Sequence, residues 1–289
     1  MTKTQHNLYV GVFILAGVAS FVLLIYNGFD YYTTSLEERF FNPSHTSLKP
    51  SGSVGHGLGI IGSLMMLIGV GVYIARKRIR QFGRIGLLKH WLEFHIFLCS
   101  VGPMFVLFHT AFKFGGIVAV SFWSMIAVVL SGVIGRYIYI QIPRSISGKE
   151  LSLNELRLID EEMAEKLEGE KALSQDLKDE INNFDFKNYM KSDSGIFTFL
   201  LKGYWITSKI LYKVNKNLTY NKVSKQNKRT ILKLTKTKLT LNRRIKLLRS
   251  MQSIFRYWHI FHLPFAIIML IIMLVHVGVT LAFGYKWIF

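Results

Sequence analysis

Five long apolar segments constrain the fold of this chain more than any other feature. Each reaches the roughly 20 residues that an α-helix needs to cross the hydrocarbon core of a bilayer. The composition agrees, since 51% of the 289 residues are hydrophobic and the mean hydropathy is +0.30. We therefore predict an all-α membrane protein with five transmembrane helices. The five segments are 8–27, 54–75, 91–112, 117–142 and 257–283.

Basic residues predict the direction in which these helices cross the membrane. The 76–89 loop carries six lysines and arginines and no acid, whereas the 28–53 loop is aromatic and mixed in charge. Because basic loops stay on the cytoplasmic side, we expect a cytoplasmic N-terminus and an outer 284–289 tail. The first segment has no small-residue cleavage site, so we expect a retained helix and not a signal peptide.

Two of the apolar segments each carry a pair of histidines at the same spacing. His95 and His109 lie in the third segment, His262 and His276 lie in the fifth, and both pairs are 14 residues apart. Fourteen residues turn an α-helix through about 1400°, roughly 40° short of four turns, and advance it by about 21 Å. Both imidazoles of a pair therefore face the same way. The first histidine of each pair ends the motif W-x-x-F-H.

Ionisable side chains inside a membrane are expensive and usually functional. Two facing pairs on neighbouring helices predict two stacked haems, each iron bound by one histidine from each helix. The third and fifth segments run in the same direction, so His95 pairs with His262 and His109 with His276. The aromatic residues of W-x-x-F-H are expected to pack on the flat haem rings. The alternative is a haem-free scaffold or transporter, in which the histidines pack or relay protons.

These four histidines and the order of the helices resemble the membrane cytochrome b of quinol–cytochrome c reductases. They also resemble the ferric-reductase/NADPH-oxidase transmembrane family, and the resemblance covers the membrane portion of the chain. It implies a di-haem b-type cytochrome. The 143–256 insert is foreign to that pattern, and neither a sixth helix nor a flavin- and nicotinamide-binding domain follows before Phe289. We therefore expect an electron-transfer subunit with no catalytic residues of its own.

Three further residues extend the candidate haem sites. Arg136, near the cytoplasmic end of the fourth segment, and Lys113, at the outer end of the third, are candidates to bind haem propionates. Snorkelling of both side chains to the membrane surface is the alternative. His56, at about the depth of His109, is a candidate to bond a propionate, bind a quinone headgroup or replace a ligand. His90, at the cytoplasmic boundary, is easily solvated and is expected to have no such role.

Other motifs exclude some classes of site. The single cysteine, Cys99, excludes a disulfide framework, a cysteine-ligated iron–sulfur cluster and covalent haem attachment through C-x-x-C-H. The string G-x-G-x-x-G at 57–62 opens an apolar segment, and no acid follows at the spacing of a dinucleotide fold. Gly55 and Gly59 instead form G-x-x-x-G, which favours close helix approach.

The 143–256 insert is expected to be cytoplasmic and helical. Ser152 and Glu155 predict a capping box at the start of a helix. All thirteen acids of the insert precede Ser194, and the sixteen lysines and arginines that follow are expected to face solvent or lipid and not nucleic acid. The amphipathic 196–214 segment has two interpretations. It lies in the headgroup layer, or it forms a helical hairpin that covers a partner or the insert's own acidic half.

The sequence thus predicts three regions: helices one to four in 1–142, the basic insert in 143–256, and the fifth helix with its tail in 257–289. The expected function is electron transfer through two b haems within a redox complex of a bacterial inner membrane. Expected partners are lipid, quinone, a cytoplasmic flavin or iron–sulfur protein, and an extracytoplasmic cytochrome c. A quinone-reactive enzyme, complete in this one chain and using His56, is the alternative from another class.

Overall fold

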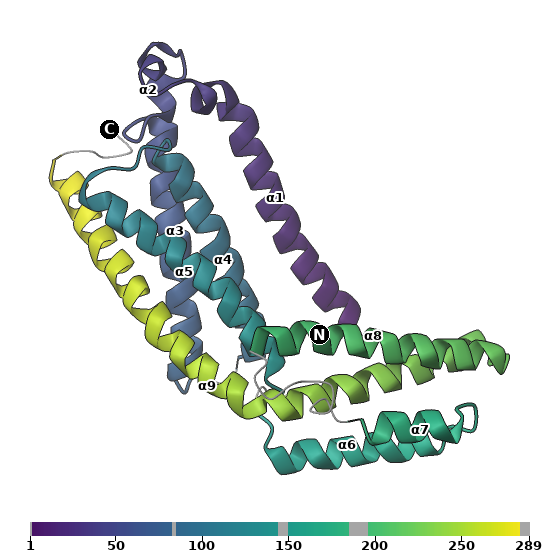
Figure 1. The fold of residues 1–289 in the computed structure, drawn as a ribbon. Helices are drawn as coiled ribbons and strands as arrows, with labels where there is room; N and C mark the ends of the chain where they lie inside the picture. Colours follow the sequence, from purple (N-terminus) through teal and green to yellow (C-terminus); the bar gives the residue numbers. More distant parts are fainter. Residues whose placement is uncertain (1, 83–84, 144–149, 185–195, 284–289) are drawn as a thin grey trace. The chain divides into compact units, whose positions relative to one another are not determined.

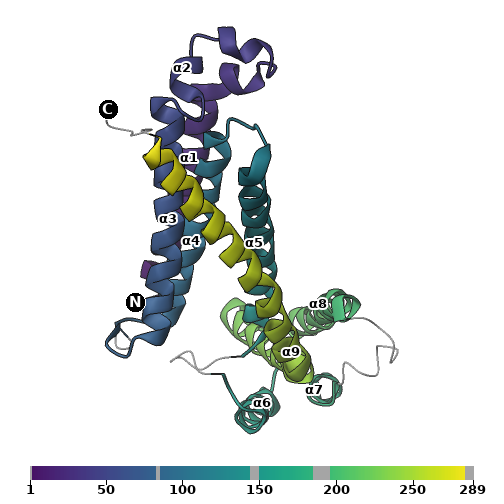
Figure 2. The ribbon, with the colours of Figure 1, turned by 90° about the vertical axis from the view of Figure 1, so that its left-hand side faces the viewer.

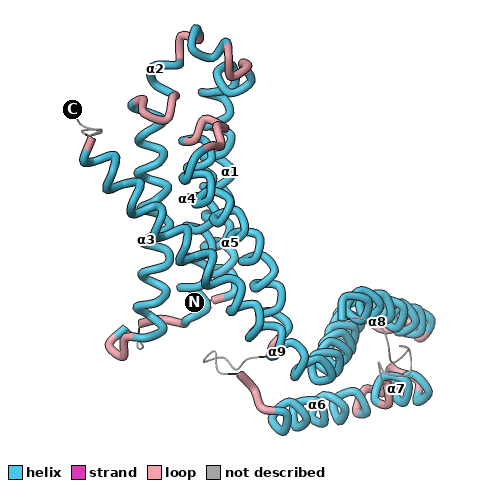
Figure 3. The backbone as a smooth tube through the Cα atoms, turned by 60° about the vertical axis from the view of Figure 1, so that its left-hand side comes forward, coloured by secondary structure: helices cyan, strands magenta, loops and turns pink. Residues whose placement is uncertain are grey.

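The computed structural model describes residues 2–82, 85–143, 150–184 and 196–283 (Figure 1). All regular elements in these ranges are helices (Figure 3). Five are long and apolar enough to cross a membrane, which confirms the prediction of five such helices. The 284–289 tail lies outside the described residues. The five are α1 (Lys3–Thr33), α3 (Ser53–Arg78), α4 (Leu88–His109), α5 (Gly116–Gln141) and α9 (Lys225–Ala282).

The remaining elements are shorter or more polar. A 3-10 helix η1 (Glu38–Phe41) and α2 (His45–Leu48) lie between α1 and α3. Between α5 and α9 lie α6 (Leu153–Glu168), α7 (Gln175–Asn182) and α8 (Ile196–Tyr220). The predicted capping box is confirmed at the start of α6, where Ser152 Oγ accepts from the Glu155 amide and the Glu155 carboxylate accepts from the Ser152 amide.

The chain divides into two compact units. The membrane unit comprises Met1–Arg136 and Arg256–Phe289, and the insert unit comprises Tyr137–Phe255. The fifth apolar segment is the C-terminal part of the 58-residue helix α9, which therefore begins well before the predicted start at 257. The physical reason is that no glycine or proline interrupts the sequence between Lys225 and Pro264.

Glycines set the packing of α3 against α4, which run antiparallel and side by side (Figure 2). A Cβ atom on Gly62 would lie 2.6 Å from the Gly102 carbonyl oxygen, and one on Gly59 would lie 2.8 Å from Nδ1 of His109. The predicted close approach of helices is thus confirmed at Gly59, whereas Gly55 packs against the Lys49 carbonyl that precedes α3. On the other side of α4, α1 packs through the stacked rings of Phe13 and Phe97, whose centroids are 4.5 Å apart.

A buried arginine ties the loop after α1 to the end of α4. Arg39 is 4% exposed and donates to the Ala111 carbonyl at 2.5 Å and to the Tyr32 carbonyl at 3.1 Å. Ala111 and Phe112 take positive φ values of 48° and 59°, so the chain turns sharply there. These contacts hold the end of α4, where His109 is the last helical residue.

The insert unit has its own hydrophobic core, built from α6, α7, α8 and the first half of α9. Apolar side chains from both the acidic and the basic halves meet in it, and Lys213 of α8 donates to Glu180 of α7 at 2.8 Å. The apolar face of α8 is therefore buried within this unit. Of the two interpretations of 196–214, the packing favours the helical hairpin over the acidic half. The fully buried members are Leu167, Ile181, Val214, Leu218, Ile231 and Leu239.

A buried ion pair in this unit gives a testable prediction. Lys238 of α9 is 1% exposed, and its Nζ lies 3.2 Å from Oδ1 of Asp160 on α6. Asp160→Asn is expected to destabilise the insert unit by about 1–3 kcal/mol, because it leaves a buried ammonium without its counter-ion. Lys238→Met removes the charge itself and is expected to be nearly neutral. Hydrogen exchange of α6 and α9 peptides in the full chain checks both; equal effects would contradict the ion-pair account.

Candidate functional site

The two histidines of α4 both bond to backbone carbonyls of α3. His95 Nδ1 lies 3.0 Å from the Gly69 oxygen, and His109 Nδ1 lies 2.8 Å from the Gly55 oxygen. A carbonyl can only accept, so each Nδ1 carries the proton and each Nε2 keeps its lone pair. This arrangement is typical of metal-binding histidines, whose other ring nitrogen donates to a protein group that fixes the tautomer.

A serine on α5 plays the same part for His262 on α9. Ser131 Oγ lies 2.7 Å from His262 Nδ1 and 2.9 Å from the Val128 carbonyl oxygen. The single hydroxyl proton goes to the carbonyl, so the hydroxyl accepts from His262 Nδ1–H and leaves Nε2 with its lone pair. Ser131 was missed by sequence reasoning, because a serine in an apolar helix is unremarkable until its neighbour is known.

The structure brings His109 and His276 together. Their ring centroids are 6.5 Å apart, with an angle of 58° between the rings. Metal–nitrogen bonds of about 2.0 Å place the centroids of two opposed imidazoles roughly 6 to 6.5 Å apart. The geometry therefore suits one metal ion between the two rings. His95 and His262 each lie beside another aromatic ring, with centroids 5.3 Å from Tyr73 and 4.7 Å from Trp258, and their pairing on one iron stays a prediction.

We call His109 with His276 the outer pair and His95 with His262 the inner pair, and a third imidazole stands beside the outer pair. The His56 ring centroid is 6.4 Å from that of His109, at an interplanar angle of 65°. His56 and His276 are thus at nearly the same distance from His109, and by distance alone either could share a metal ion with it. His56, His109 and His276 thus offer three imidazoles at one site, of which a six-coordinate haem iron needs two.

These three histidines line a cavity of about 440 Å³ in the membrane unit. Its walls come from α3, α4, α5 and α9 and are mostly apolar, as in pockets that bind cofactors. The predicted propionate partner Lys113 lines the cavity, whereas Arg136 is half-buried near the end of α5 and is not part of its lining. The apolar lining includes Met66, Phe122, Met125, Met269 and Met273.

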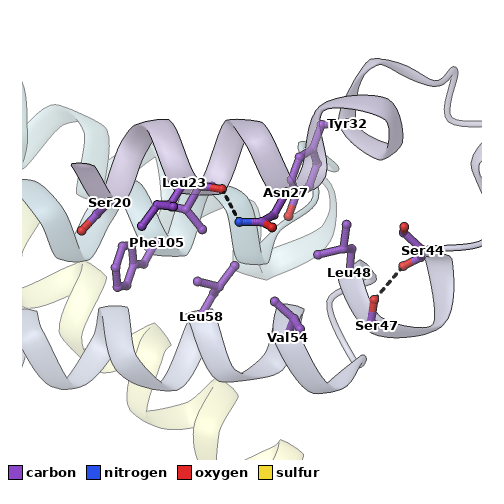
Figure 4. Close-up of a pocket in the computed structure, with 11 residues that line it drawn as sticks. Ser20, Leu23, Asn27, Tyr32, Ser44, Ser47, Leu48, Val54, Leu58 and Phe105 are labelled. Atoms are coloured by element: carbon purple, nitrogen blue, oxygen red, sulfur yellow. Dashed lines mark hydrogen bonds between the residues drawn. The ribbon is translucent and has the colours of Figure 1, made fainter. Parts of the chain in front are cut away.

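Another cavity of about 440 Å³ contains none of the predicted site residues (Figure 4). It lies among α1, α2, α3 and α4, and several of its polar side chains bond to the backbone. Asn27 donates to the Leu23 carbonyl at 2.8 Å, Tyr32 to the Phe108 carbonyl at 3.4 Å, and Ser47 to a carbonyl within its own turn. The histidine-lined cavity is therefore the better candidate for a cofactor site.

The tryptophan of the repeated W-x-x-F-H motif makes different contacts in α4 and α9. Trp258 packs over Gly135, donates to the Ser131 carbonyl at 2.7 Å, and lies 4.7 Å from His262 between centroids. Trp91 instead donates to the Ile85 carbonyl at 2.9 Å, in the loop before α4. The two tryptophans therefore have different neighbours, because each indole N–H donates to a different carbonyl, and packing of these aromatic residues on haem rings stays a prediction.

Comparison with known proteins identifies no relative. No protein-family model, no curated protein and no solved structure matches this chain. The function must therefore be inferred from the side chains themselves.

Proposed function

We propose that the membrane unit binds two b-type haems and carries electrons between them as a subunit of a membrane redox complex. The observation that supports this most is the 6.5 Å separation of the His109 and His276 rings across an apolar cavity. Bound haem would supply the one-electron chemistry. The chain's part is to bind the two irons, orient the imidazoles and keep water away.

The side chains fit such a group in several independent ways. At both proposed sites, the α4 histidine donates Nδ1–H to a carbonyl and keeps Nε2 available. The outer cavity is large and apolar, and Lys113 offers a cation to a propionate. The inner pair, His95 with His262, and the outer pair, His109 with His276, stand about 21 Å apart along the helices, as 14 residues require.

The test of this proposal is a pyridine haemochrome assay on the purified full chain. We expect two b-type haems per chain. A preparation with no Soret absorbance, made with haem supplied during expression, would instead support a haem-free scaffold or transporter. The four histidines would then be packing or proton-relay groups.

The proposal includes partners at both ends of the electron path. We propose a cytoplasmic flavin or iron–sulfur protein, or quinone, at one end and an extracytoplasmic cytochrome c at the other, in a bacterial inner membrane. The five spans expose apolar side chains such as Ile14, Val133 and Leu263, which suit contact with lipid. Reduction of the haems by each candidate donor in membrane vesicles would identify the direction of electron flow.

A quinone-reactive enzyme in one chain is the second candidate. It is favoured by the position of His56, Thr110 and Lys113 on the wall of the histidine-lined cavity. Their N–H and O–H groups could donate hydrogen bonds to a quinone headgroup held in the apolar cavity. Under this candidate, the purified chain reduces its haems with a short-chain quinol and no other protein. Unchanged haem spectra after quinol addition would contradict it.

The role of Ser131 gives a prediction for the inner site. Ser131→Ala removes the group that accepts from His262 Nδ1–H, so the imidazole loses its fixed orientation. Loss of such a supporting hydrogen bond typically weakens metal binding about 10- to 100-fold. We expect weaker haem retention at the inner site only, measured by haem transfer to apomyoglobin. Ser124→Ala, a buried serine on the same helix, is the control and should leave retention unchanged.

A further inference from the structure

A second group of metal-binding side chains lies at the opposite end of α4 from His109. Within the described part of the chain, His6, His90 and Glu93 each offer a ligand atom, and these atoms all lie within 4.8 Å of one another. We infer that this cluster is a binding site for a divalent transition-metal ion. The inference is independent of the haem proposal, because it uses none of the same residues.

Two helices hold the three side chains in place. His6 lies in the first turns of α1, while His90 and Glu93 are one turn apart at the start of α4. The Tyr9 hydroxyl donates to the His90 carbonyl at 3.3 Å, and the Phe13–Phe97 stack continues the contact one turn further. The cluster is thus built on packed helices and not on a loop, which favours a defined ligand geometry.

The nitrogen and oxygen atoms of the cluster face one another. His6 Nε2 lies 3.6 Å from Glu93 Oε1, and His90 Nδ1 lies 3.1 Å from Glu93 Oε2. The Glu93 side chain is only 11% exposed, so its charge needs a partner. Two imidazoles and one carboxylate are the ligand set of many zinc and non-haem iron sites, with open positions for water.

Lys89 now stands where a cation would bind. Its Nζ lies 3.1 Å from His6 Nε2 and 3.7 Å from Glu93 Oε1, and its side chain is 51% exposed. An ammonium can only donate, so His6 Nε2 directs its lone pair into the cluster. His6 Nδ1 is buried without a hydrogen-bond partner among the described residues. The exposed lysine can swing into solvent, and the metal then takes its place.

Metal binding changes one tautomer. In the metal-free cluster, His90 Nδ1–H donates to Glu93 Oε2 at 3.1 Å. When the metal binds Nδ1, that proton moves to Nε2 of the same ring, so the imidazole stays neutral. In the metal-free cluster, the Lys89 ammonium balances the negative charge of Glu93. When the metal is bound, the Glu93 carboxylate instead neutralises part of the metal's charge.

The test is titration of the chelator-treated full chain with Zn²⁺ alone, followed by calorimetry near neutral pH. We expect one Zn²⁺ per chain at this site, and His6→Ala and Glu93→Gln each to weaken binding by at least about tenfold. His45→Ala is the matched control, since His45 lies on α2, away from the cluster, and should bind Zn²⁺ as the wild type does.

Lys89→Ala separates a metal site from a simple ion-pair network. Removing the competing ammonium should strengthen Zn²⁺ binding several-fold, because like charges a few ångströms apart repel. Misfolding cannot imitate this gain. Zn²⁺ binding that is unchanged in His6→Ala, or weakened in Lys89→Ala, would overturn the inference. Neither result would affect the haem content on which the proposed function depends.

Discussion

On the proposed di-haem assignment, His109→Ala is expected to remove one haem and to leave the other in place. The variant deletes the Nε2 ligand of the outer pair, while His95 and His262 keep their bonds to Gly69 and Ser131. A b-type haem has no covalent link to the chain, so loss of an axial ligand releases it or leaves it weakly bound. A pyridine haemochrome assay should give half the wild-type haem, and a redox titration should show one component instead of two.

Added imidazole provides a second measurement. It should occupy the space left by the deleted side chain and restore part of the outer haem, which a merely misfolded variant would not do. Loss of both haems, or of neither, would count against the proposed pairing.

His56→Ala and His276→Ala distinguish the two possible partners of His109. Both rings stand at nearly the same distance from it, 6.4 Å and 6.5 Å. We expect His276→Ala to lose the outer haem and His56→Ala to retain it. The opposite pattern would assign the sixth ligand to His56.

Gly59→Leu is expected to have the second largest effect. Even a single Cβ at this position would lie 2.8 Å from Nδ1 and 2.9 Å from Cε1 of the His109 ring. A leucine must therefore push the imidazole away from the Gly55 carbonyl and out of line with His276. Since positioning of a metal ligand typically affects affinity by about 10- to 100-fold, the outer haem should be lost from the purified variant while the inner one remains.

The matched control lies on the same helix. A Cβ on Gly71 would meet no atom within 4 Å, so Gly71→Leu adds the same side chain in open space that suits lipid. It should retain both haems. If Gly71→Leu lost the outer haem as readily as Gly59→Leu, the effect would come from a general change in α3 and not from the His109 ring.

Much of the membrane unit could be predicted because its signals are local. An apolar run of about 20 residues is long enough to cross the hydrocarbon core of a bilayer. Each of the five candidate spans can therefore be recognised from its own segment of the sequence. The helix period then aligns His95 with His109 and His262 with His276. The capping box at Ser152 is local too, since its two partners are three residues apart.

The contact partners of the site side chains could not be predicted in this way, because they lie far away in the sequence. Nothing near His262 in the sequence points to Ser131, which is 131 residues away, or to the indole of Trp258 packing over Gly135. Similarly, His6 and Glu93 meet only because α1 packs on α4. The two copies of W-x-x-F-H likewise have different neighbours in the two helices, which the repeated motif alone does not reveal.

By itself, the sequence determined that the chain is helical, that five segments can span a membrane, and that two of them present paired imidazoles on one face. These properties depend on transfer free energies and a helical period, which each segment carries alone. Only the tertiary structure decided which carbonyls and hydroxyls fix the imidazole tautomers, and that Lys238 is buried beside Asp160. Those outcomes depend on which helices approach, and glycines such as Gly59 and Gly62 determine that approach only once both surfaces are in contact.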